Sequence, residues 1–173
     1  MSMMIELRPE AGPVLIVGGG KVAERKASVI SQGEFPITVV APEIRERIHN
    51  LPFVTIHERA FQPGDIPGVP RWALVMACTD DRAVNQEIGR LSRAENIPVL
   101  VADRQAESTF FTPATIQDGE LKVAVSTGGA SPELAKFIRE RIIGALGPRW
   151  GGMVHVARVE REERLARKRQ QPQ

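Results

Sequence analysis

The sequence has little of three features that would place it in a specialised class of protein. It contains one cysteine, Cys78, so it cannot form a disulfide within the chain, as is usual in a reducing compartment. It has no apolar run near the roughly 18 residues that a membrane-spanning helix needs. Residues 1–12 include acidic side chains and no long apolar stretch, which is not the pattern of a signal peptide. We therefore expect a cytoplasmic protein that does not contact a membrane.

A large excess of charge of one sign is also missing. The formal net charge is +2 over 173 residues. Basic residues gather near the end of the chain, but Glu160, Glu162 and Glu163 alternate with them. This alternation favours a solvated helix over a basic face for nucleic acid, so we expect no nucleic-acid partner. The basic residues are Arg158, Arg161, Arg164, Arg167, Lys168 and Arg169.

The sequence lacks the usual patterns of metal sites and nucleophilic enzymes. His49, His57 and His155 are too scattered for the common spacing of zinc ligands, and we predict no metal ligands. No Ser-His-Asp pattern and no phosphate-binding G-x-x-x-x-G-K-[ST] loop occurs. Because no histidine lies near Cys78 in the sequence, we interpret this residue as a small buried side chain and not as a nucleophile.

The first part of the chain alternates short apolar runs with helical patterns. Apolar runs without alternation are typical of strands that are buried on both faces of a parallel sheet. The order strand, helix, strand predicts a Rossmann-like α/β fold, a doubly wound parallel sheet with the carboxyl ends of its strands at one edge. The expected strands are 13–17, 35–40, 53–56, 72–77 and 97–101, and the expected helices are 22–32, 44–50 and 81–95, the last capped by Asp80.

The second part has a different rhythm. Two apolar segments around a turn at Asp118-Gly119 predict a β-hairpin. Ser131 as N-cap and Pro132 in the first helical position begin a helix, which Gly147-Pro148 ends. A hairpin with two helices buries little apolar surface alone, so we expect it to pack on the first domain or on a second subunit. These elements are strands 110–116 and 121–125 and helices 132–146 and 150–168.

A glycine turn follows the first strand. Residues 14–23 read V-L-I-V-G-G-G-K-V-A and match G-x-G-x-x-A between a strand and a helix. Gly18 permits the tight turn, Gly20 lets the backbone approach a pyrophosphate, and Ala23 keeps the helix close to the strand. The helix N-terminus then attracts the anion. The context predicts a dinucleotide site, and a turn used only for packing is the alternative.

The usual acid at the tip of the second strand, about 20 residues after the turn, is absent. The strand ends in Ala41, Pro42 and Glu43, and Glu43 is the nearest candidate for the ribose hydroxyls. Arg45 and Arg47 lie just beyond and would tolerate a 2′-phosphate, although arginines on a helix surface need no ligand. We favour NAD over NADP as the cofactor.

Two more strands end in polar residues. Thr79 follows the fourth strand and is a candidate both for contacting the cofactor and for capping the next helix, and the two roles are compatible. Asp103 follows the fifth strand, near the expected place of a nicotinamide ring. A carboxylate there can accept a proton while the substrate loses a hydride, or it can bond to loop amides. Position alone leaves both roles open.

Five segments together resemble the precorrin-2 dehydrogenases, the NAD-dependent module of sirohaem synthases. The resemblance implies that precorrin-2, a tetrapyrrole, is oxidised to sirohydrochlorin while NAD⁺ accepts a hydride. It implies that Asp103 is the catalytic acid/base and that Lys21, Val22, Pro42 and Glu43 contact NAD. The matching segments are 17–26 (V-G-G-G-K-V-A-E-R-K), 77–81 (A-C-T-D-D) with Asn85, 101–103 (V-A-D), 110–114 (F-F-T-P-A) and 123–132 (V-A-V-S-T-G-G-A-S-P).

The resemblance also implies an organisation for the chain. Residues 1–111 would bind NAD, 112–147 would form a homodimer, and 148–173 would be a helical segment with a polar tail. Some members of the family also insert Fe²⁺ or Co²⁺, and longer members continue into a methyltransferase. The chain stops at Gln173, so we expect no methyltransferase module. The segment after Gly147 is short and polar where longer members continue with a helical domain, so we expect a dehydrogenase only. The alternatives are a dehydrogenase that is also a chelatase and a non-catalytic NAD-sensing regulatory domain.

Overall fold

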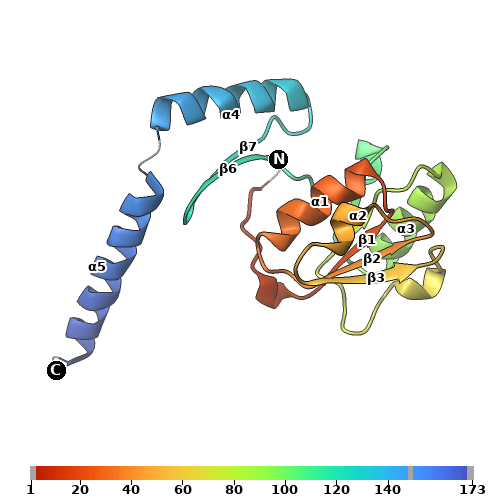
Figure 1. Cartoon of the computed structure of the whole chain (residues 1–173), viewed down its shortest axis with the longest axis horizontal. Helices are drawn as coiled ribbons and strands as arrows, with labels where there is room; N and C mark the ends of the chain where they lie inside the picture. The colour runs from red at the N-terminus through yellow and green to blue at the C-terminus, as the bar shows by residue number, and fades with distance from the viewer. Residues whose placement is uncertain (1–2, 148–149, 171–173) are drawn as a thin grey trace. The chain divides into compact units, whose positions relative to one another are not determined.

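The computed structural model describes residues 3–147 and 150–170 (Figure 1), with side chains as far as residue 167. The chain divides into two compact units, Met1–Phe111 and Thr112–Gln173. The first unit holds a five-stranded sheet and the second holds a two-stranded sheet with helices. We describe each unit by itself.

The sheet of the first unit is parallel throughout and has the strand order β3-β2-β1-β4-β5. This order is the doubly wound α/β arrangement that the sequence predicts: the strands after β1 are added first on one side of it (β2, β3) and then on the other (β4, β5). The prediction of the fold is therefore confirmed. The strands are β1 (Val14–Val17), β2 (Ile37–Ala41), β3 (Val54–Glu58), β4 (Leu74–Ala77) and β5 (Val99–Val101).

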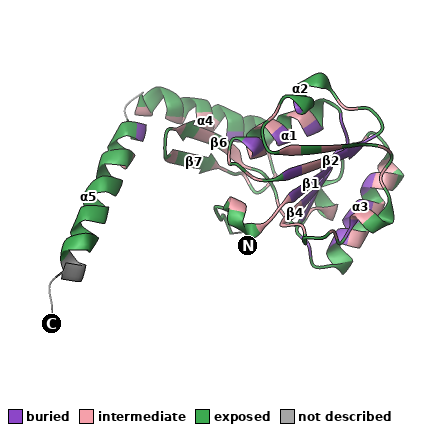
Figure 2. Cartoon of the chain, turned by 60° about the horizontal axis from the view of Figure 1, so that its bottom comes forward, coloured by how far each residue is buried: buried purple, intermediate pink, exposed green. Residues whose placement is uncertain are grey.

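Each face of the sheet has its own apolar core. Successive side chains of a strand point to opposite faces, so Ile16 lies in one core and Leu15 in the other. The first core includes Ala23 and Ala27 of helix α1 (Lys21–Ser31), and the second includes Ile88 of helix α3 (Arg82–Ala94). Figure 2 shows the buried residues along β1, β2 and β4. Burial on both faces explains why these strands show no polar alternation.

The connections depart from the expected boundaries in two places. The N-cap of α3 is Asp81 and not Asp80: its carboxylate accepts bonds from the amides of Ala83 (2.8 Å) and Val84 (3.2 Å). The helix begins at Arg82, so the residue directly before it is the one whose side chain reaches these amides. Helix α2 is short (Glu46–His49), because Arg45 before it keeps an extended backbone.

Short 3₁₀ turns complete the first unit: η1 (Pro9–Ala11), η2 (Pro63–Asp65) and η3 (Gln105–Glu107). Among the described residues, the crossover from β3 to β4 contains η2 and no α-helix. Asp65 fixes this crossover, because its carboxylate accepts a bond from Arg59 (2.9 Å) and its carbonyl accepts one from the Trp72 indole (2.7 Å). Partial burial alone would raise the pKa of Asp65, but the hydrogen bonds that the carboxylate accepts from Arg59 and from the Gln62 amide, with the charge of Arg59, lower it overall.

The second unit begins with a hairpin of β6 (Ala114–Asp118) and β7 (Leu121–Val125). The predicted turn at Asp118-Gly119 lies one residue too early. Asp118 still pairs with Leu121, and the turn consists of Gly119, with φ +56°, and Glu120. A positive φ favours glycine, which explains its position.

Two helices follow the hairpin. Helix α4 (Pro132–Leu146) begins as predicted, with the Ser131 hydroxyl accepting a bond from the amide of Leu134 (3.1 Å). Gly147 follows it with φ +66°, and Pro148, the other half of the predicted stop, lies outside the described residues. Helix α5 (Trp150–Gln170) carries charged pairs one turn apart, including Arg158–Glu162 (3.4 Å) and Arg167–Glu163 (3.7 Å).

The second unit exposes many large apolar side chains. In α4, Leu134, Phe137 and Ile143 are exposed, while Ala135 is buried. In α5 the exposed apolar residues are Trp150, Met153, Val156, Val159 and Leu165. Across residues 3–147 and 150–170, we find no helix with the length and hydropathy of a membrane span.

Candidate active site

The carboxyl edge of the parallel sheet gathers the predicted site residues of the first unit. Gly18 follows β1, Pro42 follows β2, Thr79 comes soon after β4, and Asp103 comes soon after β5. The strand order reverses at β1 and β4, and ligands of open α/β sheets bind outside such a point. The four positions therefore lie where the fold concentrates binding groups.

The three glycines of the turn have different surroundings. Gly18 has φ +121°, and a Cβ on it would lie 2.4 Å from the Cys78 carbonyl oxygen. A Cβ on Gly19 would lie 2.0 Å from the carbonyl oxygen of Glu43. A Cβ on Gly20 would meet nothing within 4 Å. The first two glycines allow close backbone packing, and the third leaves open space beside the start of α1.

This open space meets the N-terminus of α1. Gly20 is the N-cap, and its carbonyl accepts the bond from the Glu24 amide. The first amides of a helix, here those of Lys21 and Val22, have no carbonyl partner within the helix and carry partial positive charge. Ala23 is fully buried against the sheet. The turn thus has the open approach and the unpaired amides that a pyrophosphate requires.

A cleft of about 870 Å³ extends from the glycine turn along this edge. Its lining includes all seven positions that the sequence predicts for the cofactor, whereas Asp103 is not part of the lining. The cleft also includes Cys78 and Arg45, the residue directly before α2. The seven positions are Gly18, Gly20, Lys21, Val22, Pro42, Glu43 and Thr79.

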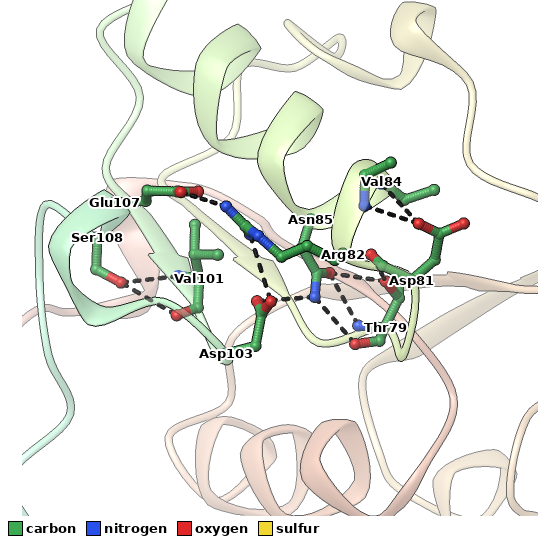
Figure 3. A network of polar contacts seen from close by, with 10 residues as sticks. Thr79, Asp81, Arg82, Val84, Asn85, Val101, Asp103, Glu107 and Ser108 are labelled. Atoms are coloured by element: carbon green, nitrogen blue, oxygen red, sulfur yellow. Dashed lines mark hydrogen bonds and ion pairs between the residues drawn. The ribbon is translucent and has the colours of Figure 1, made fainter.

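Asn85 connects this cleft with Asp103 (Figure 3). Its Oδ1 accepts bonds from the Thr79 amide (3.1 Å) and the Thr79 hydroxyl (2.7 Å). Its Nδ2 donates to the Thr79 carbonyl (3.0 Å) and to Oδ1 of Asp103 (2.9 Å). The Asn85 side chain is buried and uses both ends of its amide, so it holds the β4–α3 loop and the carboxylate at a set separation.

Arg82 holds the other oxygen of the carboxylate. Its Nη1 lies 3.4 Å from Oδ2 of Asp103, and its Nη2 donates to Glu107 of η3. The hydrogen bond with Glu107 raises the pKa of the Arg82 guanidinium, so the arginine remains charged. The Asp103 side chain is 36% exposed, so it is oriented from two sides and still open to solvent.

Cys78 is the buried side chain that the sequence predicts. It is 7% exposed and belongs to the core that includes α1. Burial raises the pKa of its thiol to about 11, against a weaker opposing effect of Lys26. The thiol is protonated at neutral pH, and a protonated thiol is a poor nucleophile.

Three residues around Asp103 were not predicted as site residues: Asn85, Arg82 and Glu107. A signal for Asn85 was available, since it lies on the buried face of α3 with Ile88 and Ser92. A polar amide at such a position needs hydrogen-bond partners. Arg82 and Glu107 gave no signal, because their pairing depends on how η3 lies beside α3.

The described residues contain no group of three or more His, Cys, Asp or Glu side chains arranged to hold a metal ion. This statement covers residues 3–147 and 150–170, with side chains as far as residue 167.

Comparison with protein families gives two adjacent matches. Residues 5–114 match the family described as "Putative NAD(P)-binding", and residues 118–144 match the family described as "Sirohaem biosynthesis protein central". The first match covers most of the chain and includes the glycine turn and Asp103. It assigns the first unit to the NAD(P)-binding domains.

Similar proteins include the siroheme synthases of Methylobacillus flagellatus (36% identity over 159 residues) and Pseudomonas aeruginosa strain PAO1 (40% over 131 residues). The matches cover 87% and 74% of this chain but 32% and 28% of those proteins, so the chain spans about a third of their length.

Among solved structures, the chain is similar to SirC, a precorrin-2 dehydrogenase. The TM-score is 0.73 at 26% identity, over 90% of this chain and 75% of that one. The fold, the family matches and the sequence relatives agree. The chain belongs to the family of precorrin-2 dehydrogenases and siroheme synthase N-terminal modules.

Proposed function

We propose that this protein catalyses the NAD-dependent oxidation of precorrin-2 to sirohydrochlorin, with Asp103 as acid/base. The observation that carries the proposal is the link through Asn85 between the cleft at the glycine turn and the carboxylate of Asp103. Similarity to SirC supports the choice of substrate, because that protein is a precorrin-2 dehydrogenase. The single buried cysteine is consistent with a reaction in the reducing cytoplasm.

The cleft fits a dinucleotide. The amides of Lys21 and Val22 would hold the pyrophosphate above Gly20, where a Cβ would meet no other atom. Glu43, exposed at the edge of the cleft, would accept a bond from a ribose hydroxyl. When bound, NAD⁺ supplies an acceptor for the hydride of the substrate.

Asp103 would then accept the proton that the substrate loses. Oxidation removes a hydride and a proton from precorrin-2, and the proton needs a base within hydrogen-bond reach. Asn85 and Arg82 each donate to one oxygen of Asp103, which orients the carboxylate and leaves it further lone pairs. Since Asp103 is open to solvent, the proton can leave to water after each turnover.

We also propose that residues 112–147 mediate a homodimer and that α5, over residues 150–170, is an additional helical segment. The exposed large apolar side chains of α4 support this proposal, because burying them against a partner would remove apolar surface from water. Phe137→Glu should convert the dimer to a monomer in light scattering. An unchanged mass would remove this face of α4 from the interface.

The decisive experiment mixes the protein, precorrin-2 and NAD⁺ and records NADH formation. We expect NADH from the unchanged protein and little from Asp103→Asn, which keeps the shape of the side chain without its charge. NADH binding with no turnover would favour the alternative of an NAD-sensing domain. Addition of Fe²⁺ or Co²⁺ to the sirohydrochlorin formed tests the second alternative, an additional chelatase activity.

A further inference from the structure

We infer that Glu24 makes this cleft selective for NAD over NADP, by pairing with the two arginines that a 2′-phosphate would need. The inference rests on the proposed binding of a dinucleotide at the glycine turn. It concerns the ribose end of the cleft, and no residue near Asp103 takes part in it.

The geometry brings together three charged side chains: one from α1, one from the residue directly before α2 and one from α2. Arg45 donates through Nε to Oε2 of Glu24, and Nη1 of Arg47 lies 3.7 Å from Oε1 of the same carboxylate. Glu24 is in the first turn of α1, while Arg45 and Arg47 are at the start of α2. Both oxygens of one carboxylate therefore face arginines that follow the second strand.

The position of Arg45 makes it the residue that would meet a 2′-phosphate. It lines the cleft, and its backbone amide donates to the carbonyl of Gly19 (3.1 Å), which anchors it beside the glycine turn. In dinucleotide-binding folds, an arginine just after the second strand is the usual partner of the 2′-phosphate of NADP. Without Glu24, this sequence would have the charge pattern of an NADP site.

Glu24 offsets the positive charge of Arg45 and Arg47. Its side chain is 16% exposed, so it is held against the protein, whereas the Arg45 and Arg47 side chains are 46% and 83% exposed. A phosphate monoester carries a charge of about −1.5 to −2 at pH 7, and it would have to displace Glu24 or lie beside it. Glu43 adds a second negative charge at the same edge. A ribose hydroxyl is neutral and meets no such repulsion.

The test is a binding measurement without turnover. NADH and NADPH are titrated by calorimetry into the unchanged chain and into Glu24→Gln, and the ratio of the two Kd values is compared. We expect the unchanged chain to bind NADH more tightly. The substitution should improve the relative affinity for NADPH at least tenfold, because it frees both arginines.

Three further variants complete the design. Glu46→Gln removes a neighbouring negative charge on α2 that the ion pairs do not use, and it should leave the ratio within about twofold. Glu24→Ala, which also removes the negative charge, should improve the relative affinity for NADPH as much as Glu24→Gln does. Adding Arg45→Ala to Glu24→Gln should return the relative affinity for NADPH towards that of the unchanged chain. Thermal unfolding of each variant shows that it is folded.

The outcomes separate this inference from the proposed function. An unchanged ratio in the folded Glu24 variants, or an equal gain in Glu46→Gln, overturns the inference and leaves NAD binding intact. Tighter binding of NADPH than of NADH by the unchanged chain also overturns it. If the unchanged chain binds neither dinucleotide, the proposed function fails first.

Discussion

The glycine turn and the surroundings of Asp103 lie at the same edge of one sheet, yet they are built in opposite ways. The turn depends on missing atoms: a Cβ at Gly18 would lie 2.4 Å from a carbonyl oxygen, and the space at Gly20 is open. The surroundings of Asp103 depend on side chains that are present, since Asn85 and Arg82 donate to its two oxygens. Substitutions that add atoms should therefore damage the turn abruptly, whereas substitutions that remove donors should weaken the Asp103 region by degrees.

The largest expected effect is at Gly18. Gly18→Val places a branched side chain at φ +121° against the Cys78 carbonyl, so the backbone strain and the overlap together should cost several kcal/mol. Gly20→Val should keep nearly the same stability, because its Cβ meets nothing within 4 Å, but should weaken NADH binding at least 100-fold by filling the pyrophosphate approach. Urea unfolding and NADH titration measure the two effects.

These neighbouring variants are controls for each other. Equal stability of the Gly18 and Gly20 variants would show that the close contact at Gly18 does not limit the fold. Unchanged NADH affinity in the Gly20 variant would show that the turn serves only packing.

The next effect is at Asp103. Asp103→Asn should lower turnover by about 10²- to 10⁴-fold, the usual contribution of a general acid or base. NADH affinity should stay within about twofold, because Asp103 is not part of the lining of the cleft. Steady-state kinetics with precorrin-2 and a separate NADH titration test the two parts. Normal turnover in this variant would remove Asp103 from the mechanism.

Asn85 should show an intermediate effect on both properties. Asn85→Ala removes the donor to Asp103 and leaves the half-buried Thr79 hydroxyl and amide with fewer partners, so we expect a loss of about 1–3 kcal/mol in unfolding free energy. Turnover should also fall, while NADH still binds. Ser92→Ala is the matched control on the same helix face, since the Ser92 hydroxyl is buried without a hydrogen-bond partner among the described residues. Equal turnover in both variants would exclude a positioning role for Asn85.

The smallest effect concerns Cys78, whose carbonyl lies against Gly18 and which directly precedes Thr79. Its pKa of about 11 in the folded protein exceeds the ordinary value of 9.0, so the folded state holds this proton more tightly. The resulting stability is complete below pH 9 and is lost as the pH rises towards 11, by as much as about 2 kcal/mol. Urea unfolding at pH 8 and pH 10.5 should show a smaller decrease for Cys78→Ala than for the unchanged chain. Parallel decreases would argue against burial of the thiol.

The sheet could be predicted because its cause is local. Five apolar runs and a G-x-G-x-x-A turn specify parallel strands, and the structure has a parallel strand at each of the five runs. Element ends were less predictable, as Asp81 and the Gly119-Glu120 turn show, because a shift of one residue changes the local energy little.

The same distinction between local and long-range causes applies to the residues of the site. Positions at strand ends follow from the sheet, so Thr79 and Asp103 could be proposed from the sequence. The pairing of charged side chains around the site could not be predicted. Glu24 and Arg45 are 21 residues apart, and Arg82 and Glu107 are 25 apart, so each pair meets only after the helices have packed. Charge alone does not indicate which of many glutamates and arginines will meet.

The contact between Gly19 and Glu43 has a consequence for engineering. A Cβ on Gly19 would lie 2.0 Å from the Glu43 carbonyl oxygen, so two pieces of backbone are in direct contact there. This contact fixes the distance between the glycine turn and the end of the second strand. In the proposed complex, exchanging charges at Glu24 or Arg45 would change the preferred dinucleotide, while the distance between the sites for the phosphates and the adenosine ribose would stay the same.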